Sequence, residues 1–171
     1  MKPGLFLDRD GVINHDNGYV WEPSEIRFID GIFELCSLFA RKGFVVIIVT
    51  NQSGIARGMY TEAELEKVMQ WMSGQFAQKG VCLTRYYYCP HLETITGPCD
   101  CRKPQPGMIL RGIEDYNIAP AKSLIIGDRE RDMEAGRAAG LAKQVLYDFN
   151  QHPNIFQAQD WSAIIKELLA Q

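Results

Sequence analysis

The sequence predicts a doubly wound α/β fold, in which helices cover both faces of a parallel β-sheet, and three patterns point to it. Residues 44–49 form a continuous apolar run rich in β-branched side chains, which is typical of a parallel strand buried on both faces. Shorter apolar runs alternate with segments of helical periodicity, which implies right-handed crossovers between parallel strands. Polar side chains follow the apolar runs directly, as they do at the carboxyl edge of such sheets.

Strands and helices are expected to alternate along the chain. The apolar runs predict strands at residues 5–8, 44–49, 85–88, 123–126 and 144–147. The periodic segments predict helices at residues 32–42, 61–79, 106–116, 132–139 and 161–168. Thr61 and Glu64 form a capping box for the second helix, and Pro106 suits the first turn of the third. Gly43 and Gly80 end the first two helices, and the aromatic third strand is expected near an edge of the sheet.

Length and composition are those of one soluble globular domain, residues 1–171, with no segment large enough for a second, capping domain. The chain is 46% hydrophobic and 23% charged. A formal net charge of -3 and the lack of a basic run argue against nucleic acid or an anionic membrane as partners. No apolar stretch is long enough to span a bilayer, and no signal-peptide core is seen, so we expect a cytoplasmic protein. No long apolar stripe is left over, which favours a monomer.

Polar side chains stand where the strongest strands are expected to end. Asp8 and Asp10 follow the first strand, and Thr50 follows the second. Asp128 follows the fourth strand, and Lys103 precedes a helix. Each residue alone has an ordinary interpretation as a turn former, a cap or a surface charge. Because the carboxyl ends of parallel strands meet at one edge of a sheet, we expect all of them to converge on one site.

These side chains suit the hydrolysis of a phosphate monoester. Two carboxylates one residue apart repel each other unless a metal ion, a proton or a cationic ligand lies between them. Oxygen ligands of this kind suit Mg²⁺, which offsets the charge of a phosphate dianion and orients it. A hydroxyl and an ammonium group can bind the remaining phosphoryl oxygens. One carboxylate can then attack phosphorus to form an acyl phosphate, while the other protonates the leaving oxygen and later deprotonates water.

A second set of metal-type ligands lies in residues 89–101, in two pairs that are each separated by one residue: Cys89, His91, Cys99 and Cys101. Such a set fits a tetrahedral Zn²⁺, and four protein ligands leave no open position, so the zinc would be structural. It would hold the loop that delivers Arg102 and Lys103. The alternatives are buried thiols beside an unrelated histidine, or one disulfide, which an odd total of five cysteines disfavours. Cys36 is expected in the core and Cys82 in a loop or at the start of a strand.

The motifs FLDRDG, VTNQSG, CRKP and IGDRERD resemble those of the haloacid dehalogenase superfamily of aspartyl phosphatases. The longer pattern from DRDGVIN through VTNQSGIARG, CPH and CDCRKPQPGM to GD is similar to the D-glycero-D-manno-heptose 1,7-bisphosphate 7-phosphatase family, with histidinol-phosphate phosphatases as its nearest relatives. The match covers about residues 5–146. It implies a Rossmann-like haloacid dehalogenase fold without a large cap. It also implies a Mg²⁺-dependent enzyme of nucleotide-heptose biosynthesis that removes the 7-phosphate through an aspartyl phosphate.

The resemblance also implies a role for each site residue. Asp8 would be the nucleophile and a Mg²⁺ ligand. Asp10 would be the general acid and base, its main-chain carbonyl would reach the metal, and Asp128 would complete the metal site. Thr50 and Lys103 would stabilise the transferring phosphoryl group. The substrate site would be lined by Asp16, Asn17, Gly18, Tyr19, Thr50, Asn51, Gln52, Ser53 and Arg102, of which the last would hold the distal, anomeric phosphate.

Some questions remain open at the level of sequence. Arg129 stands where heptose enzymes often have lysine and histidinol phosphatases often have arginine, so it either contacts the substrate or is a surface arginine. Asp132 is expected to be the N-cap of its helix rather than a carboxylate that supports the site. Residues 92–98 are fewer than in the best-known enterobacterial members, which leaves the preferred anomer open.

Three other functions compete with heptose bisphosphate hydrolysis. The chain could hydrolyse histidinol phosphate, which belongs to the same reaction class. A zinc-ribbon-like nucleic-acid binder is disfavoured by the negative charge and by the slight mixing of basic and aromatic residues around residues 86–88. An inactive scaffold is disfavoured because the acidic residues are intact.

Overall fold

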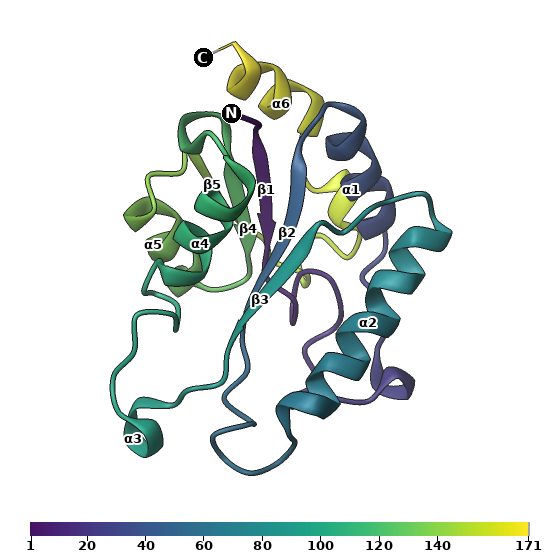
Figure 1. Cartoon of the computed structure of the whole chain (residues 1–171). Helices are drawn as coiled ribbons and strands as arrows, with labels where there is room; N and C mark the ends of the chain where they lie inside the picture. Colours follow the sequence, from purple (N-terminus) through teal and green to yellow (C-terminus); the bar gives the residue numbers. More distant parts are fainter. Residues whose placement is uncertain (171) are drawn as a thin grey trace.

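A five-stranded parallel sheet forms the centre of the protein, which the computed structural model describes for residues 1–170 (Figure 1). Its strands are β1 (Gly4–Leu7), β2 (Val45–Asn51), β3 (Arg85–Cys89), β4 (Leu124–Gly127) and β5 (Lys143–Leu146). Their order in the sheet is β3-β2-β1-β4-β5, and neighbouring strands are parallel. The chain winds from β1 through β2 to β3, and then returns to the other side of β1. This confirms the predicted doubly wound fold, with its switch point between β1 and β4.

Helices cover both faces of the sheet, as Figure 1 shows. They are α1 (Ile32–Arg41), α2 (Glu62–Gln78), α3 (Glu93–Thr96), α4 (Gly107–Tyr116), α5 (Glu130–Ala138) and α6 (Trp161–Leu169). One core cluster joins the sheet to α1, α2 and α6, and a second joins it to α4 and α5. The short α3 lies away from both cores (Figure 1). Three short 3-10 helices complete the structure: η1 (Pro23–Glu25), η2 (Pro120–Lys122) and η3 (Ile155–Gln157).

Successive residues of the central strands belong to opposite cores, because side chains alternate across a sheet. Leu5 and Leu7 of β1 lie in the cluster with α1, whereas Phe6 lies in the cluster with α4. In β2, Ile48 lies in the cluster with α1 and Ile47 in the cluster with α4. Both faces of these strands are buried, which is why their sequences are continuously apolar.

Several local predictions are confirmed. The Thr61 hydroxyl accepts the Glu64 N–H at 3.2 Å, and the Glu64 carboxylate accepts the Thr61 N–H at 2.7 Å, so the capping box is present. The aromatic strand β3 lies at an edge of the sheet. Cys36 is buried in the core, and Cys82 is exposed before β3.

Two helix starts differ from the prediction. The prediction that Asp132 is an N-cap is wrong, because α5 begins two residues earlier with Arg129 as its N-cap. The Asp132 carboxylate reaches back across the first turn and accepts the Arg129 N–H at 3.0 Å, so it serves the helix start from inside the helix. Pro106 is the N-cap of α4 and precedes the first turn. The helix starts one residue later than predicted, at Gly107, whose N–H donates to the Asp100 carbonyl at 3.0 Å.

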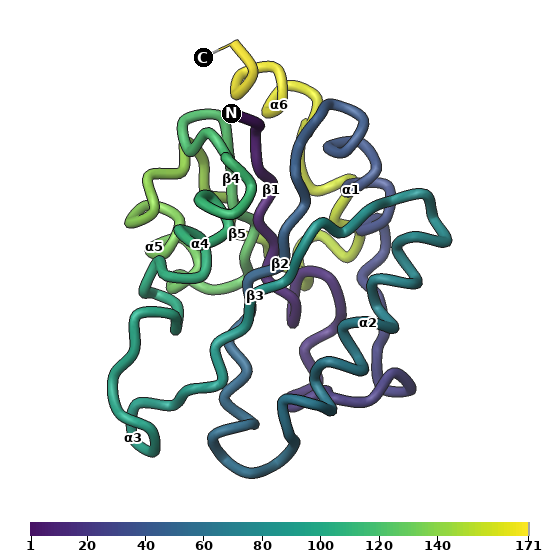
Figure 2. The backbone as a smooth tube through the Cα atoms, in the orientation of Figure 1, coloured from purple at the N-terminus to yellow at the C-terminus, as the bar shows by residue number. Residues whose placement is uncertain are grey.

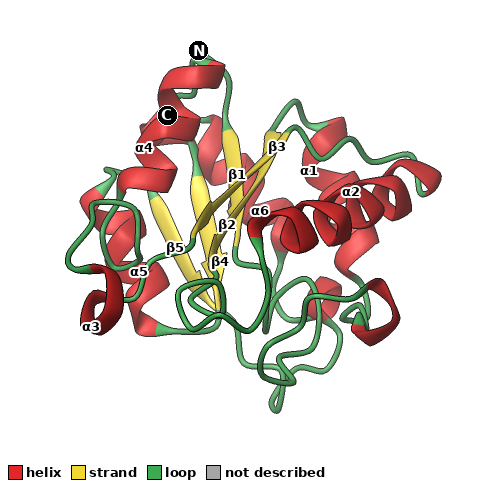
Figure 3. Cartoon of the chain, turned by 60° about the horizontal axis from the view of Figure 1, so that its bottom comes forward, coloured by secondary structure: helices red, strands yellow, loops and turns green. Residues whose placement is uncertain are grey.

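The loops that follow the strands gather at one end of the molecule. Figure 3 brings this end forward and shows the loops beyond the carboxyl ends of the strands. The tube in Figure 2 shows that both termini lie at the opposite end. Among residues 1–170, no helix has the length and apolar character that crossing a membrane requires.

Candidate active site

Acidic side chains meet at the switch point of the sheet. Asp8 follows β1, Asp128 follows β4, and Asp132 lies in the first turn of α5. One carboxylate oxygen from each lies within 4.8 Å of the others. Gly11 makes room for them, since a Cβ there would lie 2.4 Å from Asp128 Oδ2. Carboxylates this close concentrate negative charge that a cation must offset.

The buried Lys103 supplies one positive charge to these carboxylates. Its side chain is buried, with Nζ 2.9 Å from Asp8 Oδ1 and 2.6 Å from Asp132 Oδ1, and it donates to the Val49 carbonyl at 2.8 Å. Burial alone would lower the pKa of Lys103, but the charges of Asp8 and Asp132 outweigh it and raise this pKa. Asn51 fixes the lysine main chain, because its amide accepts the Lys103 N–H at 3.0 Å and donates to the Lys103 carbonyl at 3.1 Å. The ammonium group is therefore charged and held in place.

One ammonium group does not balance these acids. Burial raises the pKa of Asp128 to about 7, and the charge of Asp8 adds to this effect while Arg129 opposes it. Burial and Asp8 also raise the pKa of Asp132, although Lys103 opposes them. Raised carboxyl pKa values indicate a site short of positive charge, and a divalent cation with oxygen ligands would supply it. The chemistry of the donor set therefore fits Mg²⁺.

The Asp10 carboxylate lines the same region and is surrounded by donors. Arg9 Nη2 lies 2.9 Å from Asp10 Oδ1, and Asn14 Nδ2 donates to the same oxygen at 3.0 Å. Gln52 Nε2 donates to Asp10 Oδ2 at 3.1 Å and also to the Thr50 hydroxyl at 2.9 Å. Gln52 thus links two predicted catalytic side chains, Asp10 in the loop after β1 and Thr50 near the carboxyl end of β2.

A cavity of about 400 Å³ opens above these groups. The predicted site residues that line it are Asp8, Asp10, Asp16, Gly18, Tyr19, Thr50, Asn51, Gln52, Ser53, Arg102 and Asp128. The structure adds Arg57, Tyr60 and Arg131, which the sequence analysis did not single out. Arg57 and Arg131 lie within the motifs VTNQSGIARG and IGDRERD, and Tyr60 follows the first of these by two residues, so the motifs themselves carry the signal for these positions.

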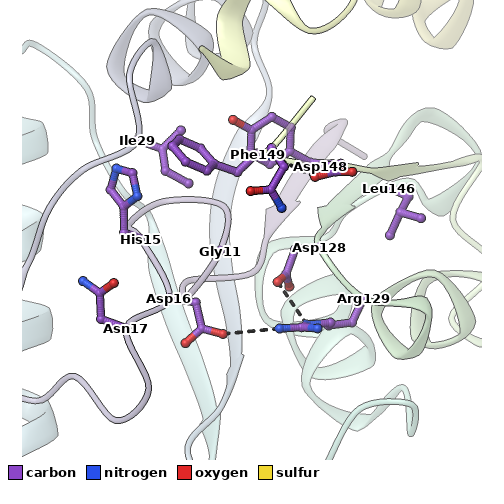
Figure 4. A pocket seen from close by; sticks show the side chains of 12 residues that line it. Gly11, His15, Asp16, Asn17, Ile29, Asp128, Arg129, Leu146, Asp148 and Phe149 are labelled. Atoms are coloured by element: carbon purple, nitrogen blue, oxygen red, sulfur yellow. Dashed lines mark hydrogen bonds and ion pairs between the residues drawn. The ribbon is translucent and has the colours of Figure 1, made fainter. Parts of the chain in front are cut away.

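Arg129 and Asn17 line a neighbouring cavity of about 510 Å³ rather than the first one (Figure 4). Arg129 Nε lies 3.2 Å from Asp128 Oδ2, and its Nη2 lies 3.5 Å from Asp16 Oδ2. Asp16 and Asp128 line both cavities. Arg129 is thus an exposed arginine that pairs with acids at the boundary between the two cavities.

The predicted cysteine and histidine ligands lie together. The Sγ atoms of Cys89, Cys99 and Cys101 and Nδ1 of His91 all lie within 4.8 Å of one another. All the cysteines are free, so the disulfide alternative is not observed. Arg102 follows this cluster directly, and its Nη1 donates to the His91 carbonyl at 3.2 Å. The cluster therefore positions the arginine that lines the cavity above Asp8.

The fold, the site and a family model together indicate the class of hydrolase to which the protein belongs. Residues 100–152 match a family model described as "HAD-hyrolase-like". This segment contains Lys103, Asp128 and Asp132. The chain is thus of the HAD-like hydrolase class, which its doubly wound sheet and the acids at the switch point also indicate.

Comparison with individual proteins identifies the family within this class. The D-glycero-beta-D-manno-heptose-1,7-bisphosphate 7-phosphatase of Vibrio cholerae is 45% identical over 150 residues, which are 85% of this chain and 81% of that protein. The protein of the same name from Escherichia coli K12 is 43% identical over 166 residues, or 93% and 87% of the two chains. A D,D-heptose 1.7-bisphosphate phosphatase from B. bronchiseptica, complexed with magnesium and phosphate, has a TM-score of 0.80, 31% identity and 98% coverage of both chains. The chain belongs to the D-glycero-beta-D-manno-heptose-1,7-bisphosphate 7-phosphatase family.

Proposed function

We propose that the protein is a Mg²⁺-dependent phosphatase that removes the 7-phosphate from D-glycero-D-manno-heptose 1,7-bisphosphate and leaves heptose 1-phosphate. One observation carries the proposal. In a chain of this family, Asp8, Asp128 and Arg102 line one cavity, and the buried Lys103 lies 2.9 Å from the Asp8 carboxylate. We further propose that it acts as a cytoplasmic monomer of one domain in nucleotide-heptose biosynthesis.

Asp8 is the nucleophile of this reaction. Its carboxylate attacks phosphorus, the bond from phosphorus to the C7 oxygen breaks, and an aspartyl phosphate forms. Asp10 gives a proton to the departing sugar oxygen and then takes one from the water that attacks the aspartyl phosphate. Inorganic phosphate leaves and Asp8 is regenerated. The Thr50 hydroxyl binds a phosphoryl oxygen, and the positive charge of the buried Lys103, held beside Asp8, stabilises the negative charge that develops there.

The Asp8 and Asp128 carboxylates and the main-chain carbonyl of Asp10 would hold Mg²⁺. When bound, the ion offsets the charge of the phosphate dianion that otherwise repels a carboxylate nucleophile. Asp132 lies close enough to join them, but its carboxylate already pairs with Lys103 and accepts the Arg129 N–H. Asp132 therefore supports the site rather than completing the metal coordination.

Arg102 would hold the distal phosphate. Its guanidinium group lines the cavity and is steadied by the His91 carbonyl, and its planar donor fork suits two phosphate oxygens at once. The sugar would lie between the two phosphate sites, along Asp16, Gly18, Tyr19, Asn51 and Ser53, whereas Asn17 lines the neighbouring cavity. Arg129, at the boundary of the two cavities, would contact the same substrate from the side of Asp16.

We also propose that Cys89, His91, Cys99 and Cys101 hold a structural Zn²⁺. The Sγ atoms of Cys89 and Cys99 lie 3.6 Å apart, as do those of Cys99 and Cys101, and those of Cys89 and Cys101 lie 2.9 Å apart. The two longer separations are roughly those of thiolates that each lie about 2.3 Å from one tetrahedral zinc. The ion would tie β3 to the segment that carries Arg102.

The test is phosphate release by the purified protein from the α and β heptose 1,7-bisphosphates, with histidinol phosphate as the comparison. We expect a higher kcat/KM for one heptose anomer than for histidinol phosphate, and the opposite ranking would refute the assigned substrate. Asp8→Asn should abolish turnover of every ester without changing the Tm by more than a few degrees. Undiminished turnover in this variant would refute the mechanism.

A further inference from the structure

The Gln52 side-chain amide is fully occupied within the protein. Its two N–H groups donate to Asp10 Oδ2 at 3.1 Å and to the Thr50 hydroxyl at 2.9 Å. Its Oε1 accepts the hydroxyl of Tyr60. Gln52 is 3% exposed and Tyr60 is 4% exposed. Because both amide hydrogens are in use, Gln52 has no donor left for a substrate, although it lines the cavity.

Tyr60 is itself fixed from two sides. Its ring stacks on Trp21, with centroids 5.3 Å apart and an interplanar angle of 13°. A Cβ at Gly54 would lie 2.1 Å from the Tyr60 ring, so only glycine lets the ring approach this close to the chain. Burial is the main cause that raises the pKa of Tyr60 to about 12, so the hydroxyl keeps its proton and acts as a donor to Gln52.

We propose that Tyr60 and Gln52 are positioning residues for proton transfer: the Tyr60 hydroxyl fixes the Gln52 amide so that its NH₂ group faces Asp10 and Thr50. This inference rests on the proposed function, in which Asp10 protonates the departing oxygen. Gln52 acts through Asp10 and Thr50, and Tyr60 acts through Gln52. Neither side chain needs to touch the substrate.

The chemistry of the amide explains why the hydroxyl matters. Without the Tyr60 donor, the buried Gln52 carbonyl has lost its partner, and the amide can rotate about its last torsion. Rotation would turn the carbonyl oxygen towards the Asp10 carboxylate and remove the N–H groups from Asp10 and Thr50. Two acceptors facing each other repel, so Asp10 would leave the orientation in which it reaches the departing oxygen.

The effect should depend on the leaving group. A sugar alkoxide needs a proton to depart, whereas para-nitrophenolate departs without one. We therefore propose measuring Tyr60→Phe with para-nitrophenyl phosphate and with the alkyl ester that the unmodified protein hydrolyses fastest. The expected result is a roughly ten-fold lower kcat for the alkyl ester, with its KM and the kcat for the aryl ester within about two-fold of the unmodified protein. An equal loss on both esters, a change in KM alone or no change would overturn the proposal.

Tyr88→Phe is the matched control. Tyr88 lies on the edge strand β3, does not line the cavity, and donates its hydroxyl to Glu62 of α2. The substitution should leave both reactions unchanged, and a loss like that of Tyr60→Phe would overturn the assignment of the effect to Gln52. Gln52→Met keeps the length of the side chain and removes both donors. Adding Tyr60→Phe to Gln52→Met should cause no further loss, since Tyr60 acts through Gln52, whereas additive losses would overturn the proposal. Absence of turnover in the unmodified protein would overturn the proposed function and this inference with it.

Discussion

Replacing Lys103 with methionine should destabilise the protein strongly, because the lysine is the buried cation between two acids. Its side chain is 1% exposed, and those of Asp8 and Asp132 are 7% and 0% exposed. Removing one partner of a buried ion pair typically costs about 3–5 kcal/mol. Here both carboxylates lose their cation, but protonation of one of them limits the loss. We expect the free energy of unfolding to fall by about 3–4 kcal/mol at pH 8 in a chelating buffer.

Lys143→Met is the matched control in urea denaturation. Lys143 Nζ lies 2.8 Å from Glu167, a similar distance, but the two side chains are 33% and 61% exposed. An exposed pair of this kind contributes about 0–1 kcal/mol. The loss for Lys103→Met should also be smaller at pH 5, since protons then neutralise the acids whose pKa values burial raises. Equal losses in the two variants would refute the view that Lys103 holds the acids together.

The remaining predictions concern metal, substrate and zinc. In a chelating buffer the protein should lose stability as the pH rises from about 4 to about 7 and then change little, because the pKa of Asp128 in the folded protein is raised from 3.8 to about 7. Asp128→Asn should reduce this loss by roughly 1–2 kcal/mol in urea titrations, and an unchanged slope would contradict us. Arg102→Lys should raise KM roughly ten-fold for the 1,7-bisphosphate, because lysine lacks the bidentate donor fork that holds the distal phosphate. The KM for heptose 7-phosphate, which has no distal phosphate, should not change. An equal change for both substrates would exclude contact with the distal phosphate. Cys99→Ser should lower the zinc content measured by atomic absorption together with kcat, and full activity without zinc would contradict the structural role.

The sheet and most of the site could be predicted because burial and topology leave few choices. Strands buried on both faces have continuously apolar sequences, so β2 was evident from residues 44–49. The carboxyl ends of parallel strands meet at one edge, so the convergence of Asp8, Asp128 and Lys103 followed once the strands were placed. The Cys and His pairs were visible because their spacing is local.

The features that were missed depend on side-chain directions that local spacing does not determine. Asp132 was predicted as an N-cap, but a carboxylate at the third helical position can reach the same amide and Lys103 as well. Asn51 was predicted to line the substrate site, and its amide also clamps the main chain of Lys103. Tyr60 contacts Gln52 only because the loop between them folds back over Gly54.

The pairing of β1 with β4 also determines when the site can form during synthesis. Phe6 lies beside Ile125 in the sheet, so the two carboxylates proposed to bind Mg²⁺ join only after most of the chain has left the ribosome. The cysteines and the histidine proposed to bind zinc are all made before β4. A nascent chain could therefore bind zinc early while it still lacks Asp128. Hydrolytic competence would then appear late and in a single step, when the returning strand docks against the first.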